Sequence, residues 1–118
     1  MDKKHLMPVS KENADHYNWG DHCEGWRFVD DPGISVIQER MPPGASEVSH
    51  FHERAKQFFF ILNGRAEVSL DGKETVLHPG MGIEIASQCK HHIRNPGPDI
   101  LEFILVSSPN THDDRVNL

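Results

Sequence analysis

Four side chains in two stretches of the chain could together bind a metal ion. His50 and His52 stand two residues apart and Gln57 follows five residues later, whereas His91 lies in a second stretch, GMGIEIASQCKHHIRN. Side chains at i and i+2 of a β-strand point to the same face, so an extended His50-Phe51-His52 directs two imidazoles into one space. Three imidazoles and an amide oxygen converging inside a small β-structure would form a site for one divalent transition metal. Imidazole suits iron, zinc, nickel and manganese alike, so the ligands do not fix the metal.

The strand that carries Gln57 continues into a large apolar run and ends at a turn. Residues 58–62, FFFIL, combine aromatic and β-branched side chains as a buried strand does, and Asn63-Gly64 supplies the turn signal. Further strands are expected at residues 34–41, 48–52, 65–70, 73–77, 83–86, 92–95 and 100–107. Short strands at this spacing, separated by Gly and Pro turns and without an amphipathic helix, predict an all-β barrel or sandwich.

The spacing of the histidines and glycines resembles the two motifs of the cupin superfamily. The residues that match the first motif are Gly44, His50, His52, Gln57 and Gly64, and those that match the second are Gly80, His91 and Asn95. The family usually has Glu at position 57, Pro at 86 and Gly at 88. The resemblance implies an all-β double-stranded β-helix, a jelly-roll-like barrel, with one metal at its centre. It implies no particular reaction, because this fold serves dioxygenases, isomerases, decarboxylases and pure binding proteins.

Length and charge limit the domain organisation and the partners. The 118 residues are expected to form a single cupin domain with an N-terminal arm (1–18), a barrel (34–107) and a tail (108–118). A net charge of −6 argues against nucleic acid and anionic membranes as partners, since both attract basic surfaces. Because we find neither a membrane-spanning apolar run nor the apolar core of a signal peptide, we expect a cytoplasmic protein. Cys23 and Cys89 are then expected to be free thiols.

Gln57 is the main departure from the family pattern. A carboxylate would cancel one charge of a divalent ion, whereas an amide oxygen cancels none. The expected consequences are weaker metal retention, a stronger Lewis acid and better tolerance of an anionic ligand. Gln57 either ligates the metal directly or forms only hydrogen bonds beside a three-histidine site, and the sequence leaves both readings open.

The sequence indicates no particular acid–base residue. Glu84 and Glu102 each stand between apolar residues, so each is either a proton-transfer group inside the barrel or, as we expect, part of the solvent face. His92 follows His91 and should therefore point to the opposite face of the strand. Within residues 34–41, Glu39 faces away from its two neighbours, but the pattern does not show which face lies inside.

The apolar run at residues 58–62 also carries large side chains on its second face. If Gln57 points into the barrel, then Phe58, Phe60 and Leu62 point outward, and a small barrel rarely leaves such a patch in water. The patch is covered either by the N-terminal segment with its tryptophans or by a second subunit. We expect a homodimer, since an isologous pair is the commonest symmetric assembly.

Two classes of function fit these observations. The first is a metal-dependent enzyme that acts on a small molecule, with the ion as Lewis acid or oxygen activator, in a dioxygenase, isomerase or lyase. The second is a non-enzymatic module that binds a small sugar- or acid-like ligand, which the absence of Glu at position 57 favours. Metal identity, substrate and reaction are not determined by the sequence.

Overall fold

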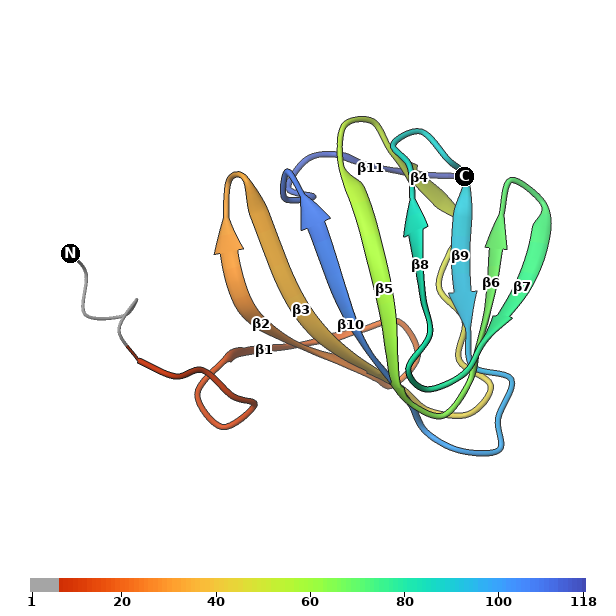
Figure 1. Cartoon of the computed structure of the whole chain (residues 1–118), viewed down its shortest axis with the longest axis horizontal. Helices are drawn as coiled ribbons and strands as arrows, with labels where there is room; N and C mark the ends of the chain where they lie inside the picture. The colour runs from red at the N-terminus through yellow and green to blue at the C-terminus, as the bar shows by residue number, and fades with distance from the viewer. Residues whose placement is uncertain (1–6) are drawn as a thin grey trace.

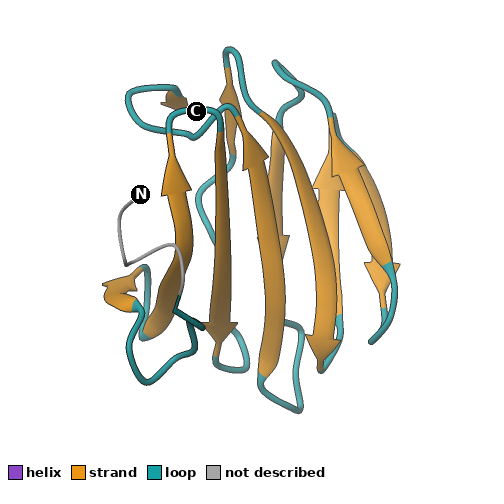
Figure 2. Cartoon of the chain, turned by 60° about the vertical axis from the view of Figure 1, so that its left-hand side comes forward, coloured by secondary structure: helices purple, strands orange, loops and turns teal. Residues whose placement is uncertain are grey.

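Two antiparallel sheets face each other in the computed structural model, which describes residues 7–118 (Figure 1; Figure 2). The first sheet has the order β1 (Asp15–Trp19), β2 (Cys23–Asp31), β3 (Ile34–Met41), β10 (Leu101–Ser108), β5 (Lys56–Asn63) and β8 (Gly82–Ile85). The second has the order β11 (Arg115–Asn117), β4 (His50–His52), β9 (His91–Arg94), β6 (Ala66–Leu70) and β7 (Lys73–Leu77). The described residues contain no helix, and the two facing antiparallel sheets confirm the predicted all-β double-stranded β-helix.

The sheets extend beyond the range expected for the barrel. β1, within the predicted arm, is an edge strand that pairs with β2, and β2 pairs with β3. β11, within the predicted tail, pairs with β4 through Arg115 opposite His52 and Asn117 opposite His50. Residues 1–6 of the predicted arm lie outside the described part of the chain. Both terminal segments therefore contribute strands to the sheets, and the strand from the tail lies directly beside β4 with its two histidines.

The core lies between the sheets and is built from alternating positions of the strands. β5 buries Phe59 and Ile61, and the neighbouring β10 buries Phe103 and Leu101. The rings of Phe59 and Phe103 stack with centroids 5.3 Å apart. Burying a side chain of this size stabilises the fold by about 2–3 kcal/mol. This packed layer holds β5 and β10 at a fixed distance from the opposite sheet.

Two turns show why the sequence needs glycine. Asp71-Gly72 closes the two-residue hairpin between β6 and β7, with φ of 48° at Asp71 and 85° at Gly72, as a primed turn requires. Gly64 follows β5 with φ of 77°, and a Cβ there would lie 2.5 Å from the carbonyl oxygen of Ile100. A side chain at position 64 would therefore push β5 away from the loop that leads into β10.

The outer face of β5 is apolar and exposed in the single chain. Phe58 is 41% exposed and Leu62 is 43% exposed. The N-terminal segment lies elsewhere, because Lys11 stacks on Trp26 at 4.3 Å and pairs with Glu102 at 3.2 Å. The described N-terminal residues therefore do not cover the outward-facing apolar patch on β5. Coverage by the N-terminal segment, one of the two possibilities expected from the sequence, does not occur within the described residues.

The structure resolves which polar residues lie outside the barrel. Glu84 is exposed and pairs with Lys56 at 3.2 Å. Glu102 accepts a hydrogen bond from Gln38 on the outer face of β10. Both glutamates therefore lie on the solvent face, as expected. Both cysteines are free thiols, also as expected. Residues 7–118 include no helix long and apolar enough to span a membrane.

Candidate metal centre

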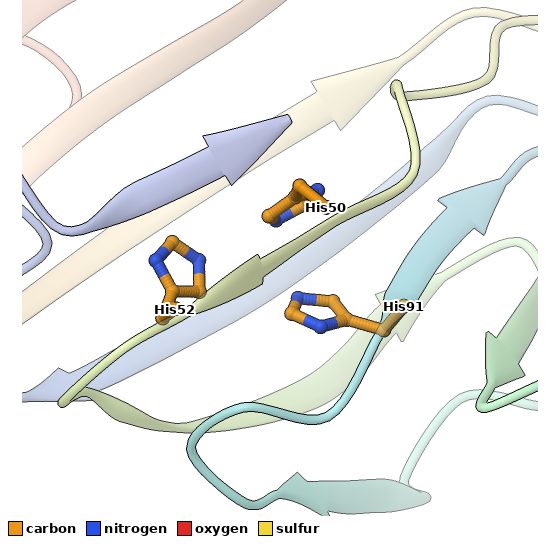
Figure 3. A group of neighbouring side chains, drawn as sticks. All are labelled: His50, His52 and His91. Carbon is orange, nitrogen blue, oxygen red and sulfur yellow. The ribbon is translucent and has the colours of Figure 1, made fainter. Parts of the chain in front are cut away.

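Three histidines from two adjacent strands of the second sheet converge between the sheets (Figure 3). His50 and His52 are the first and last residues of β4, so both point inward while Phe51 turns away. His91 begins β9 and stands opposite His50 in the antiparallel pair. The i, i+2 spacing and the pairing of β4 with β9 together place the three imidazoles in one space, as the sequence predicted.

The three rings are close enough to share an ion. One ring nitrogen from each histidine can be chosen so that the three atoms all lie within 4.8 Å of one another. The ring centroids of His50 and His91 are 4.3 Å apart, and those of His50 and His52 are 5.0 Å apart. All three side chains are buried. A transition metal holds its nitrogen ligands at about 2.0–2.1 Å, and therefore at most about 4.2 Å apart, so an ion would hold the three nitrogens closer together than 4.8 Å.

Backbone carbonyls orient two of the three rings. Nδ1 of His50 lies 2.7 Å from the carbonyl oxygen of Val48, and Nδ1 of His91 lies 2.8 Å from that of Cys89. A carbonyl oxygen only accepts, so both Nδ1 atoms must donate and both Nε2 atoms of the neutral rings carry a free lone pair. This arrangement fixes the tautomer in which Nε2 is available as a metal ligand.

Burial keeps the three imidazoles neutral at physiological pH. It lowers the pKa of His50 to about 3 and that of His52 to about 4. It also lowers the pKa of His91. The neighbouring histidines and Arg115 add to these shifts by disfavouring further positive charge. Neutral imidazole is the form that binds metal, so protons compete little for these nitrogens near pH 7.

Gln57 enters the same space from β5 in the opposite sheet. Its Nε2 donates to Ser107 Oγ at 3.0 Å, and its Oε1 lies 3.2 Å from Nε2 of His91. Ser107 stands directly opposite Gln57 in the β5–β10 pair, and both side chains are buried. All four residues predicted for the metal site therefore meet at one place.

The donor set fits a divalent cation. Oε1 of Gln57 and the lone pair of His91 Nε2 are both acceptors, so a cation between them would satisfy both atoms. Among the described residues, the buried Nδ1 of His52 has no hydrogen-bond partner. Three neutral imidazoles and one amide oxygen are ligands that first-row transition metals accept. These observations agree with the expected metal site and do not identify the metal.

A cavity of about 290 Å³ reaches the histidines from the surface. His50, His52 and Gln57 form one part of its wall. The remaining wall carries further polar residues, among them Tyr17, Arg27, Ser35, Glu39, Glu47 and Arg115. These six come from β1, β2, β3, the loop before β4, and β11. Only the alternation along β3 hinted at one of them, Glu39, and it could not show which face lies inside.

His92 does not join the cluster. It follows His91 on β9, and its side chain is half-exposed whereas that of His91 is buried. The alternation of a regular strand turns it to the opposite face, as predicted. His92 thus offers a matched control for the effect of removing a histidine from β9.

Two facing antiparallel sheets around a buried histidine cluster define a small double-stranded β-helix barrel. A family model described as "Cupin domain" matches residues 37–107, which is more than half of the chain. The chain therefore belongs to the cupin family. The matched range includes both strands of histidines and Gln57, so the motif resemblance seen in the sequence is confirmed.

Several known proteins are similar to this chain in sequence or in fold. The chain is 32% identical over 69 residues to "Polyketide synthase CurC" of Streptomyces cyaneus, a match that covers 58% of this chain and 45% of that protein. KdgF from Halomonas sp. superposes with a TM-score of 0.80 at 23% identity, over 88% of this chain and 94% of that chain. A predicted oxalate decarboxylase from Thermotoga maritima also gives a TM-score of 0.80, at 22% identity, over 88% and 100% of the two chains.

The similarity to these proteins is limited in length or in sequence identity. The chain spans less than half the length of CurC. At 22% and 23% identity, the two solved structures show that the fold is shared. The names of these proteins refer to different chemistries, as is usual for folds that host many functions.

Proposed function

We propose that this cupin is a metal-dependent enzyme that acts on a small molecule in the 290 Å³ cavity. The observation that carries the proposal is the convergence of His50, His52 and His91, whose ring nitrogens lie within 4.8 Å of one another. Two of these histidines, His50 and His52, line the cavity. A structural cluster of three buried imidazoles without an ion would bury polar atoms at a cost, as the unpartnered Nδ1 of His52 illustrates. One divalent ion, such as iron, zinc, nickel or manganese, would offset that cost.

Gln57 is proposed as the fourth ligand. The bond from its Nε2 to Ser107 turns its Oε1 toward the histidines. The alternative is a three-histidine site in which the Gln57 side chain forms only its hydrogen bond to Ser107. In either case the ligands are neutral, so the ion keeps its full charge and favours an anionic oxygen of a bound molecule. Arg115, which also lines the cavity, adds positive charge near its wall.

The metal would serve as a Lewis acid or as an oxygen activator. The chain itself would bind the substrate in the cavity, orient it against the histidine wall and limit its contact with water. A dioxygenase, an isomerase and a lyase all fit this description. The fold similarity to a predicted oxalate decarboxylase is compatible with a lyase.

A turnover screen of metal-stripped and reloaded protein tests the enzymatic proposal. Protein reloaded separately with iron, zinc, nickel or manganese would be incubated with small hydroxy- and keto-acids and sugars, in air and under nitrogen. We expect turnover with at least one metal and none with the stripped protein. Oxygen uptake would indicate a dioxygenase, and conversion under nitrogen an isomerase or lyase. A reloaded protein that binds ligands without converting them would contradict the enzymatic proposal.

That last outcome is the second candidate function, a binding module for a small sugar- or acid-like ligand. One observation favours it. The Gln57 amide already donates to Ser107, so the residue that replaces the usual Glu is held in place without chemistry at the metal. The same screen with ligand binding measured by calorimetry separates the two functions.

We also propose that the protein is a cytoplasmic homodimer with no nucleic-acid or membrane partner. The net charge of −6 supports the absence of those partners. The exposed Phe58 and Leu62 on β5 support the dimer, because a second copy would remove this apolar face from water.

A further inference from the structure

A buried carboxyl group faces the same cavity as the histidines. On β3, Ser35, Ile37 and Glu39 occupy alternate positions, and all three line the cavity wall. Glu39 is only 9% exposed. His50, His52 and Gln57 line another part of this wall. A molecule that fills the cavity would therefore lie against Glu39 as well as against the histidine cluster.

Tyr17 holds Glu39 in place across a glycine. Tyr17 on β1 stands opposite Gly25 on β2, which in turn stands opposite Glu39 on β3. The Tyr17 ring lies over Gly25, where any Cβ would overlap it, and its hydroxyl donates to Glu39 Oε2 at 2.5 Å. An exchange of glycine for alanine at position 25 would displace the ring without removing either partner of this hydrogen bond.

The surroundings place the titration of Glu39 near neutral pH. Burial raises the pKa of Glu39 to about 7, while the Tyr17 hydroxyl and the Arg115 and Arg27 cations oppose the rise. Burial and the charge of Glu39 likewise raise the pKa of Glu47, in the loop before β4, to about 8. The charged and titratable groups that interact with Glu39 are Tyr17, Cys23, Arg27, Glu47 and Arg115. The same cavity wall also carries Asp30, His50, His52 and His112. A carboxyl group tuned in this way can both accept and return a proton at physiological pH.

A second observation points to a ligand on this wall. Ser35 is 4% exposed and lines the cavity on the same face of β3 as Glu39. Within residues 7–118 its hydroxyl has no hydrogen-bond partner. A buried hydroxyl without a partner is costly, and a polar group of a bound molecule would supply one.

We propose that Glu39 is the acid–base residue of this cavity and that Tyr17 is its positioning residue. The proposal rests on the proposed function, since it needs a substrate in the cavity. The Glu39 carboxylate would accept a proton from a C–H or O–H group of that substrate. An O–H bond then forms on Glu39 as the C–H or O–H bond of the substrate breaks, and the electron pair of the broken bond stays on the substrate. The carboxyl group would then return the proton to another atom of the substrate, so that no further reactant is consumed.

Infrared titration tests this role without knowledge of the substrate. The carbonyl band of a protonated buried carboxyl group is followed against pH in metal-free protein, in zinc-loaded protein and in zinc-loaded protein with azide. The azide stretch itself shows whether the anion binds the metal. We expect a band with a midpoint near pH 7 in the metal-free parent that Glu39→Gln removes and Glu47→Gln keeps, beside a Glu47 band that Glu47→Gln removes. Tyr17→Phe should raise the midpoint, because the lost hydroxyl stabilises the charged form.

The effect of azide on the Glu39 midpoint tests the proposed role of Glu39 in the cavity. An anion bound in the cavity disfavours the Glu39 carboxylate, so azide should raise the midpoint by roughly one unit in zinc-loaded protein. If azide binds the metal and the Glu39 band does not move, the role of Glu39 is overturned while the metal centre stands. The absence of a Glu39 band that titrates within about one unit of pH 7 overturns the proposal by itself. An unshifted azide stretch, with the Glu39 titration intact, overturns the metal centre and with it this role.

Discussion

Replacing Asp114 by Asn should destabilise the protein by about 2–4 kcal/mol, because one buried carboxylate ties the tail to the loop that follows β4. Asp114 is 2% exposed. Its Oδ1 accepts from the backbone N–H of Arg54 at 3.0 Å, and its Oδ2 accepts from that of Ala55 at 2.8 Å. In the Asp114→Asn variant one of these oxygens becomes an NH₂ group that faces a donor. One backbone N–H then loses its partner, which costs about 1–3 kcal/mol, and a charge-assisted bond is lost as well.

The pH dependence of this effect follows from the same bonds. Burial alone would raise the pKa of Asp114, but the hydrogen bonds from Ala55 and Arg54 outweigh it and hold the pKa below the usual Asp value. A carboxyl group whose pKa is lowered by folding contributes stability above its unfolded pKa and loses it as the pH falls through the folded value. The difference between parent and Asp114→Asn should therefore be full at pH 7 and shrink in strong acid.

Urea unfolding of metal-free protein measures the difference, and Asp113→Asn is the control. Asp113 is exposed and has φ of 57°, a conformation that Asn tolerates. The control should lie within about 0.5 kcal/mol of the parent. An Asp114→Asn variant that is as stable as this control would refute the reasoning, because it would show that the Asp114 bonds contribute nothing to folding.

Three further predictions concern the cavity and the outer face. Glu39→Gln should change how stability depends on pH. The raised pKa of Glu39 contributes stability that is present at acid pH and is lost as the pH rises through about 7. In urea unfolding, the parent should therefore lose about 3 kcal/mol more stability than the variant between pH 5 and pH 9. Gln57→Glu should bind zinc roughly tenfold more tightly in chelator competition, because the new carboxylate cancels part of the charge of the ion. Leu62→Glu should convert the proposed dimer to a monomer in analytical ultracentrifugation, whereas Val76→Glu, at a similarly exposed position on β7, should not.

Each of these predictions has a contrary result. Parallel stability profiles for Glu39→Gln and the parent would mean that Glu39 titrates alike in the folded and unfolded chains. Unchanged or weaker zinc binding by Gln57→Glu would show that Gln57 does not face the ion. A parent that sediments as a monomer would refute the proposed dimer. Dissociation by Val76→Glu as well as by Leu62→Glu would show that the contact is not confined to the outer face of β5.

The metal-site geometry could be predicted because it depends on local rules. The i, i+2 spacing of His50 and His52 fixes a shared face on any regular strand. The spacing to Gln57 and His91 matched a family pattern, and the structure brings the two residues within 3.2 Å. Most strands were predictable for the same reason, since their turns carry Gly, Pro or Asn-Gly and Asp-Gly pairs.

The opposite wall of the cavity could not be predicted because it depends on pairings between distant segments. Alternation along β3 permits either face to be inside, and only its pairing with β2 and β10 turns Glu39 inward. The contact between Tyr17 and Glu39 also requires Gly25 between them, which local sequence rules do not reveal. Arg115 reaches the cavity through three residues of β11 in a segment that looked like a polar tail.

We propose above all that His50, His52 and His91 hold one divalent metal beside the cavity. Metal analysis of protein purified without a metal-affinity tag tests it most directly, with His50→Ala, His91→Ala and the control His92→Ala purified in parallel and checked for folding. We predict about one equivalent of one metal in the parent and in His92→Ala, and its loss from the other two variants. A folded parent that retains no metal after exposure to iron, zinc, nickel and manganese would contradict the claim, and so would full retention by His50→Ala and His91→Ala.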